Sequence, residues 1–202
     1  FLHADVYRQE AKAFFEQFGY EVLVAGRRTS LSLEECAKKS DVVIVSVPIS
    51  KTIGIIERVG PLVKEGGLLM DLTSVKKGPV DAMLKNSKAA VIGIHPLFGP
   101  GVKTMKNQTI VLCPSRPKDY LSWITRLFSR EGAKLKELSA EDHDRMMAII
   151  QGLMHFNSIS MCHSLKGVGK SMSEMEQLSS PIFRFAMDTV GRILNQDPAL
   201  YA

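Results

Sequence analysis

The sequence comprises 202 residues, of which 45% are hydrophobic and 23% charged, values that are ordinary for a globular protein with one large domain or two small ones. No uninterrupted apolar run approaches the roughly 20 residues that span a bilayer. The first residues also lack the basic-then-apolar layout of a secretory signal, so we expect a cytoplasmic protein. The net charge of +5 is spread along the chain without a basic helix, which favours small anionic ligands over nucleic acid.

The first elements resemble half of a dinucleotide-binding unit. Residues 8–18 carry apolar side chains at helical spacing, Gly19 is predicted to end that helix, and residues 21–25 are predicted as a strand. Such a pair should be preceded by another strand and a Gly-x-Gly-x-x-Gly turn. That turn is missing from the sequence. Either the chain as given omits it, which we favour because the sequence does not start with Met, or this copy has lost it.

A basic turn follows the strand predicted at 21–25. Where the dinucleotide-binding pattern places an acidic residue for the ribose of NAD, this chain has Arg27, Arg28 and Thr29. Two guanidinium groups and a hydroxyl suit a 2′-phosphate through forked hydrogen bonds. The three residues are therefore candidate NADP contacts, and a solvated basic turn is the alternative.

Alternating strands and helices continue to residue 138. Ser32 and Glu35 have capping-box spacing at the start of a helix predicted over 31–39. The Val/Ile-rich run at 41–47 predicts a central strand that is covered on both faces. Further strands are predicted at 68–72, 90–94, 109–113 and, at an edge, 134–138, with helices over 53–63, from 78 to 84 and over 118–130. This alternation indicates an α/β fold with a doubly wound parallel sheet over residues 1–139.

Polar residues follow two of these strands. Residues 73–77 follow the strand at 68–72 with Thr73, Ser74 and two lysines, and His95 follows the strand at 90–94. The carboxyl ends of strands in open α/β sheets are where ligands bind. His95 is a candidate general base because neutral imidazole accepts a proton near pH 7. Its alternative is a His-Pro turn that caps a strand, and Ser74 is either a partner of His95 or a helix cap.

The composition changes at Ser139. A capped helix start is followed by a broad apolar stripe without a strand-like run, so residues 140–202 are predicted to form a helical domain. A polar break is predicted at 167–173, and a helix over 178–189 is predicted to be interrupted by Pro181. Neither the histidines nor the three widely spaced cysteines have the spacing of metal ligands, so no metal site is predicted.

Five segments, which occur in the same order, resemble the prephenate dehydrogenase (TyrA-type) family, and the resemblance extends from roughly residue 12 to the last residue. They are Asp-Val-Val-Ile-Val-Ser-Val-Pro-Ile (41–49), Asp-Leu-Thr-Ser-Val-Lys (71–76), Gly-Ile-His-Pro-Leu-Phe-Gly-Pro (93–100), Glu-Asp-His-Asp (141–144) and Leu-Ser-Ser-Pro-Ile-Phe-Arg (178–184). The resemblance implies a Rossmann-type dinucleotide domain followed by an all-helical dimerisation and substrate domain, both incomplete as given. It also implies a homodimer that uses NADP or NAD, with NADP slightly favoured, to oxidise and decarboxylate prephenate to 4-hydroxyphenylpyruvate in tyrosine biosynthesis.

The resemblance also implies roles for individual residues. His95 would accept the hydroxyl proton of prephenate, and Ser74 would position His95 or the nicotinamide. Arg192, which we expect to be buried among apolar residues and therefore paired with an anion, would bind the ring carboxylate. His155 would line the substrate pocket, Arg184 would be a substrate-site or structural cation, and His143 would fix the domain junction. The remaining cofactor contacts would be Ser46, Val47, Pro48 and Thr73.

Three other functions remain open. Arogenate dehydrogenase is the closest variant, because arogenate differs from prephenate only in an amino group that replaces the side-chain keto group. A non-catalytic ligand-binding or dimerising module that keeps this fold would account for the missing glycine turn. A dehydrogenase of the 3-hydroxyacid or pyrroline-carboxylate reductase type would share the architecture but gives no reason for the Gly-Ile-His-Pro segment.

Overall fold

The computed structural model describes residues 2–99 and 102–194 and divides the chain into two compact units, Phe1–Asp144 and Arg145–Ala202. The division falls inside one helix, a few residues beyond the boundary predicted from the composition. The end of the predicted helical domain, 195–202, lies outside the described residues. Within the described residues, no helix is both long and apolar enough to cross a membrane.

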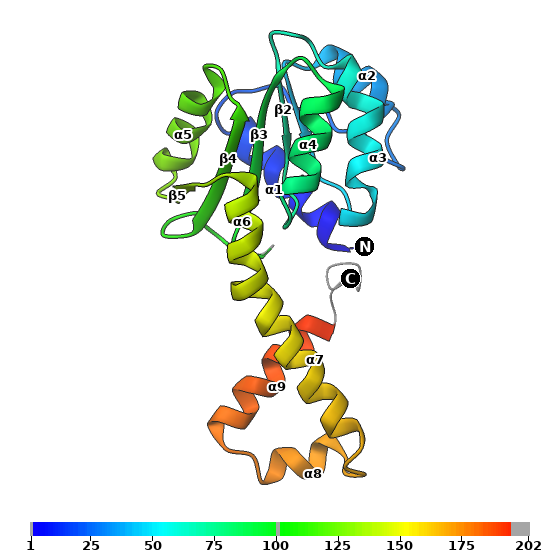
Figure 1. The fold of residues 1–202 in the computed structure, drawn as a ribbon, viewed down its shortest axis with the longest axis vertical. Coiled ribbons are helices and arrows are strands. Elements are labelled where there is room, and N and C mark those ends of the chain that lie inside the picture. The colour runs from blue at the N-terminus through cyan, green and yellow to red at the C-terminus, as the bar shows by residue number, and fades with distance from the viewer. Residues whose placement is uncertain (1, 100–101, 195–202) are drawn as a thin grey trace. The chain divides into compact units, whose positions relative to one another are not determined.

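A five-stranded sheet forms the centre of the first unit (Figure 1). Its strands lie in sequence order: β1 (Val42–Val45), β2 (Leu68–Asp71), β3 (Ala90–Pro96), β4 (Thr109–Arg116) and β5 (Lys134–Glu137). The pairs β1–β2, β2–β3 and β4–β5 are parallel, and β3–β4 is antiparallel. Parallel neighbours need a crossover, usually a helix, whereas the described residues between β3 and β4 contain none. The α/β fold predicted from the sequence is confirmed, with this one antiparallel pair.

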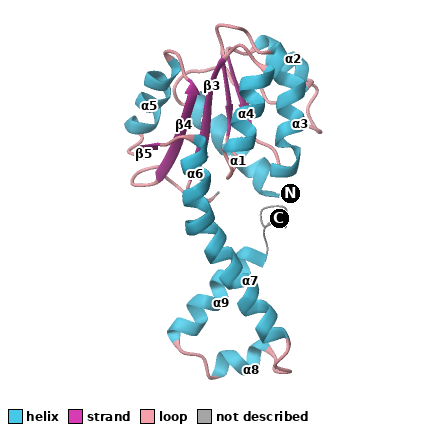
Figure 2. Ribbon diagram, in the orientation of Figure 1, coloured by secondary structure: helices cyan, strands magenta, loops and turns pink. Residues whose placement is uncertain are grey.

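Helices cover both faces of the sheet, as Figure 2 shows. On one face, α2 (Leu33–Lys39), α3 (Ile49–Val59) and α4 (Lys77–Asn86) bury a core that includes Ile56 and Met83 against alternate strand residues such as Leu69. On the other face, α1 (Leu2–Glu16) and α5 (Tyr120–Arg130) pack Phe14 and Ile124 against the remaining strand residues, such as Met70. Since successive side chains of a strand point to opposite faces, strands as apolar as β2 and β3 are buried on both.

Two predictions about the first strands are wrong. Residues 21–25 form no strand, because their backbone groups form no hydrogen-bond ladder with any strand of the described sheet. The strand β1 also lies at an edge of the described sheet rather than in its centre, and only Val45 of its four residues is buried. By contrast, the capping box at α2 is confirmed: Ser32 Oγ accepts from the Glu35 backbone N–H, and Glu35 accepts from the Ser32 N–H.

Helices make up the described part of the second unit. The chain continues from α6 (Ala140–Met147), through a π-helical segment (Ala148–Gly152), into α7 (Leu153–Lys166), α8 (Met172–Gln177) and α9 (Pro181–Leu194), and α7 packs on α9. Pro181 begins α9 rather than interrupting a helix, which corrects the prediction. The first turn is the position that proline favours, because its missing N–H would have no intrahelical partner there.

Candidate active site

A buried ion pair anchors the loop that follows β2. Lys76 and Asp71 are both inaccessible to solvent, and Lys76 Nζ lies 2.5 Å from Asp71 Oδ2 and 2.9 Å from the carbonyl oxygen of Ile94. The Thr73 backbone N–H donates to Asp71 Oδ2 over 3.0 Å, and the Thr73 hydroxyl contacts the same carboxylate oxygen. Lys76, one of the two lysines predicted to follow β2 at the ligand-binding edge of the sheet, is therefore not available to a ligand. Lys76 instead ties the ends of β2 and β3 together from inside the core.

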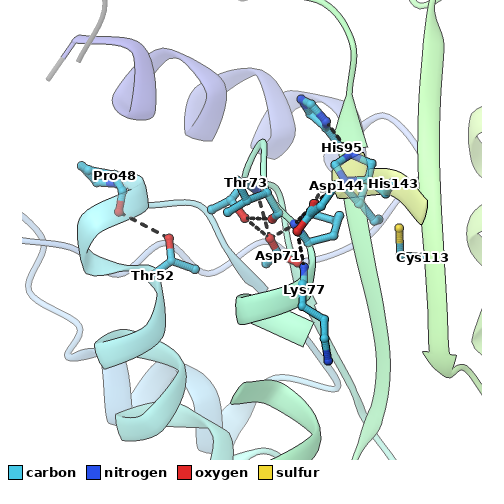
Figure 3. Close-up of polar contacts among 12 residues, drawn as sticks. Pro48, Thr52, Asp71, Thr73, Lys77, His95, Cys113, His143 and Asp144 are labelled. Atoms are coloured by element: carbon cyan, nitrogen blue, oxygen red, sulfur yellow. Dashed lines mark hydrogen bonds and ion pairs between the residues drawn. The ribbon is translucent and has the colours of Figure 1, made fainter. Parts of the chain in front are cut away.

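Beside this ion pair, three side chains form a hydrogen-bonded row (Figure 3). His95, at the carboxyl end of β3, places Nδ1 2.9 Å from Nε2 of His143, which lies on α6. Nδ1 of His143 lies 2.7 Å from Oδ1 of Asp144. The two carboxylate oxygens of Asp144 accept the backbone N–H groups of Lys76 and Lys77 over 2.8 and 2.9 Å, where α4 begins. The row therefore connects the end of one strand to the N-terminus of a helix.

Burial sets the protonation states in this row. Burial, and to a smaller extent the neighbouring His143 and Lys76, lowers the pKa of His95 to about 3. Burial also lowers the pKa of His143. Burial opposes the ionisation of Asp144, but the hydrogen bonds from Lys77, His143 and Lys76 outweigh that effect and lower its pKa. At neutral pH, His95 and His143 are therefore neutral imidazoles, and Asp144 is a carboxylate.

The other predicted residues of the first unit lie around the carboxyl ends of β1 and β2. Ser74 is half-buried in the loop that follows β2, the strand that pairs with β3, and no hydrogen bond joins Ser74 to His95 among the described residues. The half-buried residues Ser46, Val47 and Pro48 follow β1, and the Pro48 carbonyl oxygen accepts from the Thr52 hydroxyl (Figure 3). These loops lie at the sheet edge where a dinucleotide binds in open α/β folds.

The basic turn at residues 26–30 is exposed. Arg27 and Arg28 reach solvent, while the Thr29 hydroxyl accepts from the Gly26 N–H over 2.8 Å and lies within 3.0 Å of the Gly26 carbonyl oxygen. The hydroxyl therefore closes the turn, and the two arginines are the groups it presents outward. Two exposed guanidinium groups on a closed turn fit an anionic group such as a phosphate.

Three predicted substrate residues belong to the second unit. Arg192, on α9, is exposed, so the expectation that burial forces it to pair with an anion is wrong. Arg184, on the same helix, donates from Nε to the Ser179 hydroxyl over 2.9 Å. His155, on α7, is half-buried, and this burial lowers its pKa.

Sequence reasoning found His95 but missed most of its partners. Asp71, Lys76, His143 and Asp144 all lie in the segments 71–76 and 141–144, from which the sequence predicts a family resemblance and, for His143, a place at the domain junction, but no pairing with His95. The feature of the sequence that could have indicated these residues is the position of charged or titratable side chains next to apolar runs. Which of them pair could not be read from spacing, because Lys76 and Asp144 are brought together only by the packing of α6 against the start of α4.

Comparisons with known proteins agree on one family. Residues 22–137 match the description "Prephenate dehydrogenase, nucleotide-binding domain", and residues 139–202 match "Prephenate dehydrogenase, dimerization domain". The chain is 38% identical to a probable arogenate/prephenate dehydrogenase of Methanocaldococcus jannaschii, over 94% of this chain and 47% of that protein. It is also 38% identical to the T-protein of Haemophilus influenzae, over 91% of this chain and 49% of that protein. The chain thus spans about half the length of these curated relatives.

Solved structures share the fold. Synechocystis arogenate dehydrogenase superposes with a TM-score of 0.65 at 21% identity, over 84% of this chain and 63% of that one. Aquifex aeolicus prephenate dehydrogenase, solved with hydroxyphenyl propionate and NAD+, superposes with a TM-score of 0.61 at 18% identity, over 84% of this chain and 60% of that one. Together with the two matched domains, which cover residues 22–137 and 139–202, these similarities show that the chain belongs to the prephenate dehydrogenase family.

Proposed function

We propose that this chain carries the catalytic residues of an NAD(P)-dependent dehydrogenase that oxidatively decarboxylates prephenate to 4-hydroxyphenylpyruvate. The observation that carries the proposal is a buried, neutral His95 at the carboxyl end of β3, in a chain that matches the prephenate dehydrogenase family. When bound, the nicotinamide supplies the hydride acceptor. The protein must then remove the hydroxyl proton, orient the ring and bind two carboxylates.

His95 is the proposed proton acceptor. Its Nδ1 is engaged by His143, and in the part of the chain that the structure describes Nε2 makes no hydrogen bond. A neutral nitrogen with a free lone pair can accept the hydroxyl proton of an alcohol while hydride leaves the carbon that bears the hydroxyl. Ser74, in the loop after the neighbouring strand, is proposed to hold the alcohol or the nicotinamide beside this nitrogen. Loss of carbon dioxide makes the ring aromatic, so the reaction needs no further acid or base on the protein.

The substrate carboxylates are assigned to the second unit. Arg192 presents an exposed guanidinium, whose planar fork suits the ring carboxylate. His155 and Arg184 are proposed to contact the remainder of the substrate. A homodimer through this unit is proposed as well, because it matches a dimerization domain and exposes many large apolar side chains.

The cofactor is proposed to bind along the carboxyl ends of β1 and β2. Ser46, Val47, Pro48, Thr73 and Ser74 lie in the two loops there, and Arg27, Arg28 and Thr29 form the basic turn that would bind a 2′-phosphate. Among these, the Thr73 hydroxyl contacts the Asp71 carboxylate and the Thr29 hydroxyl closes its own turn. We therefore expect the two arginines, rather than Thr29, to discriminate NADP from NAD.

Reduced nicotinamide formation tests this function. The protein expressed from its complete coding sequence is assayed with prephenate and with arogenate, each with NAD and with NADP. We expect turnover of prephenate with both cofactors and lower KM for NADP. An Arg27→Ala/Arg28→Ala variant should raise the KM for NADP at least about tenfold, or about 1.4 kcal/mol, and leave that for NAD unchanged. Turnover of arogenate alone would reassign the substrate, and no turnover of either would indicate a binding module.

A further inference from the structure

In the row Asp144–His143–His95, all hydrogen bonds are donated toward Asp144. The hydrogen bond between two neighbouring side chains determines which ring nitrogen of each histidine carries the hydrogen. We propose that Asp144, acting through His143, fixes His95 in the tautomer that carries its hydrogen on Nδ1, so that Nε2 is the free acceptor. His143 and Asp144 are then positioning residues for the proton acceptor. The inference rests on the proposed function in that His95 is the base, but the tautomer itself is a property of the chain.

The direction begins at Asp144. Its Oδ1 accepts the Lys76 N–H over 2.8 Å, and its Oδ2 accepts the Lys77 N–H over 2.9 Å. Both donors lie at the N-terminus of α4, where the helix dipole and the unpaired N–H groups favour an anion. An ionised carboxylate can only accept hydrogen bonds. The contact of 2.7 Å between Asp144 Oδ1 and His143 Nδ1 therefore requires the hydrogen on Nδ1 of His143.

The next step passes through His143, which is fully buried. A neutral imidazole has one N–H and one acceptor nitrogen, so a hydrogen on Nδ1 leaves Nε2 of His143 as an acceptor. The 2.9 Å contact with His95 Nδ1 is then a hydrogen bond donated by His95. A charged His143 would reverse this last bond, but its ring is out of contact with water and lies near the buried ammonium of Lys76, which disfavours a second positive charge.

The two tautomers of His95 differ in function. With its hydrogen on Nδ1, His95 has a lone pair on Nε2 and can accept a proton. With the hydrogen on Nε2, which a neutral imidazole in water prefers, that nitrogen is a donor and cannot. A second group that bonds one ring nitrogen commonly decides which form is present. In a serine protease, placing the catalytic histidine in the wrong tautomer lowers turnover by about 10⁴-fold.

Nitrogen-15 NMR of the histidine rings in the 202-residue chain tests the proposal without an activity assay. Two-bond proton–nitrogen spectra at pH 7 distinguish a protonated ring nitrogen from a bare one. We expect His95 and His143 both to carry hydrogen on Nδ1 and to be bare at Nε2. A His95 ring protonated on Nε2 in the unmodified chain would overturn the proposal, and this spectrum needs no variant.

Two variants then show whether His143 is the cause. His143→Leu removes the acceptor, and we expect His95 to shift to the form protonated on Nε2. His143→Gln can accept from His95 through Oε1 and donate to Asp144 through Nε2, and we expect it to retain the original tautomer. His163→Leu, on an exposed position of α7, is the matched control. If His95 keeps its Nδ1 hydrogen in His143→Leu, the fixing of the tautomer is not due to His143 and the proposal is wrong.

Turnover separates this inference from the proposed function. In the protein expressed from its complete coding sequence, His143→Leu should lower kcat by at least about tenfold, and His143→Gln should restore part of it. The KM for prephenate should stay the same, since His143 is proposed to act through His95. If His95→Asn retained full turnover while the NMR result held, the function would be wrong and the tautomer assignment right.

Discussion

Lys76 is a charged side chain with no access to solvent, and its partner Asp71 is equally buried. Asp71 Oδ1 has no hydrogen-bond partner among the described residues, so this carboxylate depends on Lys76 and Thr73. Removing one member of a buried pair leaves an uncompensated charge, which typically costs about 3 to 5 kcal/mol. We therefore expect Lys76→Met to lower the free energy of unfolding by that amount in a urea titration.

An exposed ion pair provides the control for this change. Lys64 lies 2.7 Å from Asp41, and both side chains are largely in water. Pairs of this kind contribute about 0 to 1 kcal/mol, so Lys64→Met should be nearly silent. Combining Lys76→Met with Asp71→Asn should recover much of the lost stability, because the second change removes the stranded charge. Equal effects of Lys76→Met and Lys64→Met would contradict the role assigned to the buried pair.

The neutral state of His95 also predicts how stability depends on pH. Its pKa is about 3 in the folded protein, against 6.5 for the free group. Below pH 6.5 the unfolded chain binds a proton that the folded one excludes, so this contribution to stability is complete above pH 6.5 and is lost as pH falls toward 3. The slope is about 1.4 kcal/mol per pH unit, or about 2 kcal/mol between pH 6.5 and pH 5. Urea unfolding at pH 7 and pH 5 measures it.

The variants for this measurement are His95→Asn and His163→Asn. Replacing His95 should reduce the loss of stability between pH 7 and pH 5, whereas replacing His163, which is exposed on α7, should leave it as in the unmodified chain. His143, whose pKa burial also lowers, should account for much of the dependence that remains in His95→Asn. A chain equally stable at both pH values would show that His95 is protonated without difficulty, and hence not buried as described.

At the scale of elements, β3 packs closely because Gly93 has no side chain. A Cβ atom at Gly93 would lie 2.9 Å from Val80 Cγ2 and 3.0 Å from Lys76 Cδ. Both neighbours are buried and cannot move into solvent. Overpacking of this kind costs about 1 to 3 kcal/mol. We therefore expect Gly93→Ala to destabilise the chain by that amount, as measured by urea unfolding.

Gly66 is the matched glycine for this test. It lies in the turn before β2, and a Cβ atom there would meet nothing within 4 Å. Gly66→Ala should therefore leave the unfolding midpoint within the equivalent of about 0.5 kcal/mol, the usual range for surface substitutions. If Gly93→Ala were as stable as Gly66→Ala, β3 and α4 would not pack as closely as described.

Elements that are specified by a few consecutive residues could be predicted from the sequence. Features that depend on pairing with a distant strand could not. The capping box of Ser32 and Glu35, and the apolar runs that become β2 and β3, are visible in a few consecutive residues. The strand predicted at 21–25 has the right composition, but composition does not show whether a segment pairs with a neighbouring strand, and these residues pair with none in the described sheet. The sequence also does not show that β3 and β4 are antiparallel. The relative direction of two paired strands depends on the path of the chain that connects them.

At the scale of the molecule, the second unit exposes large apolar side chains of the kind that proteins usually cover. Phe156 on α7 is 67% exposed, and Phe185 on α9 is 74% exposed. Aromatic residues that become buried at an interface commonly dominate its binding energy. If the proposed homodimer forms through this unit, replacing both by glutamate should raise the dimer dissociation constant by at least about tenfold, which corresponds to about 1.4 kcal/mol.

Sedimentation equilibrium of the 202-residue chain measures this constant. Ile53→Glu is the control, because Ile53 is a partly exposed apolar residue on α3 of the first unit and lies outside the proposed interface. It should leave the dissociation constant unchanged. A chain that is monomeric at all concentrations would contradict the proposed homodimer, and a dimer that the double variant does not weaken would place the dimer contact elsewhere.

His95 is proposed to accept the hydroxyl proton during hydride transfer. The most direct measurement is the turnover of prephenate by His95→Asn, in the protein expressed from its complete coding sequence, followed by formation of reduced nicotinamide at saturating substrate. Asparagine keeps a side chain of similar size but has no nitrogen that accepts a proton at neutral pH. We expect kcat to fall by about 10² to 10⁴, the usual contribution of a general base, with the dissociation constant for prephenate little changed. A kcat within about threefold of the unmodified protein would contradict the claim and remove His95 from the chemistry.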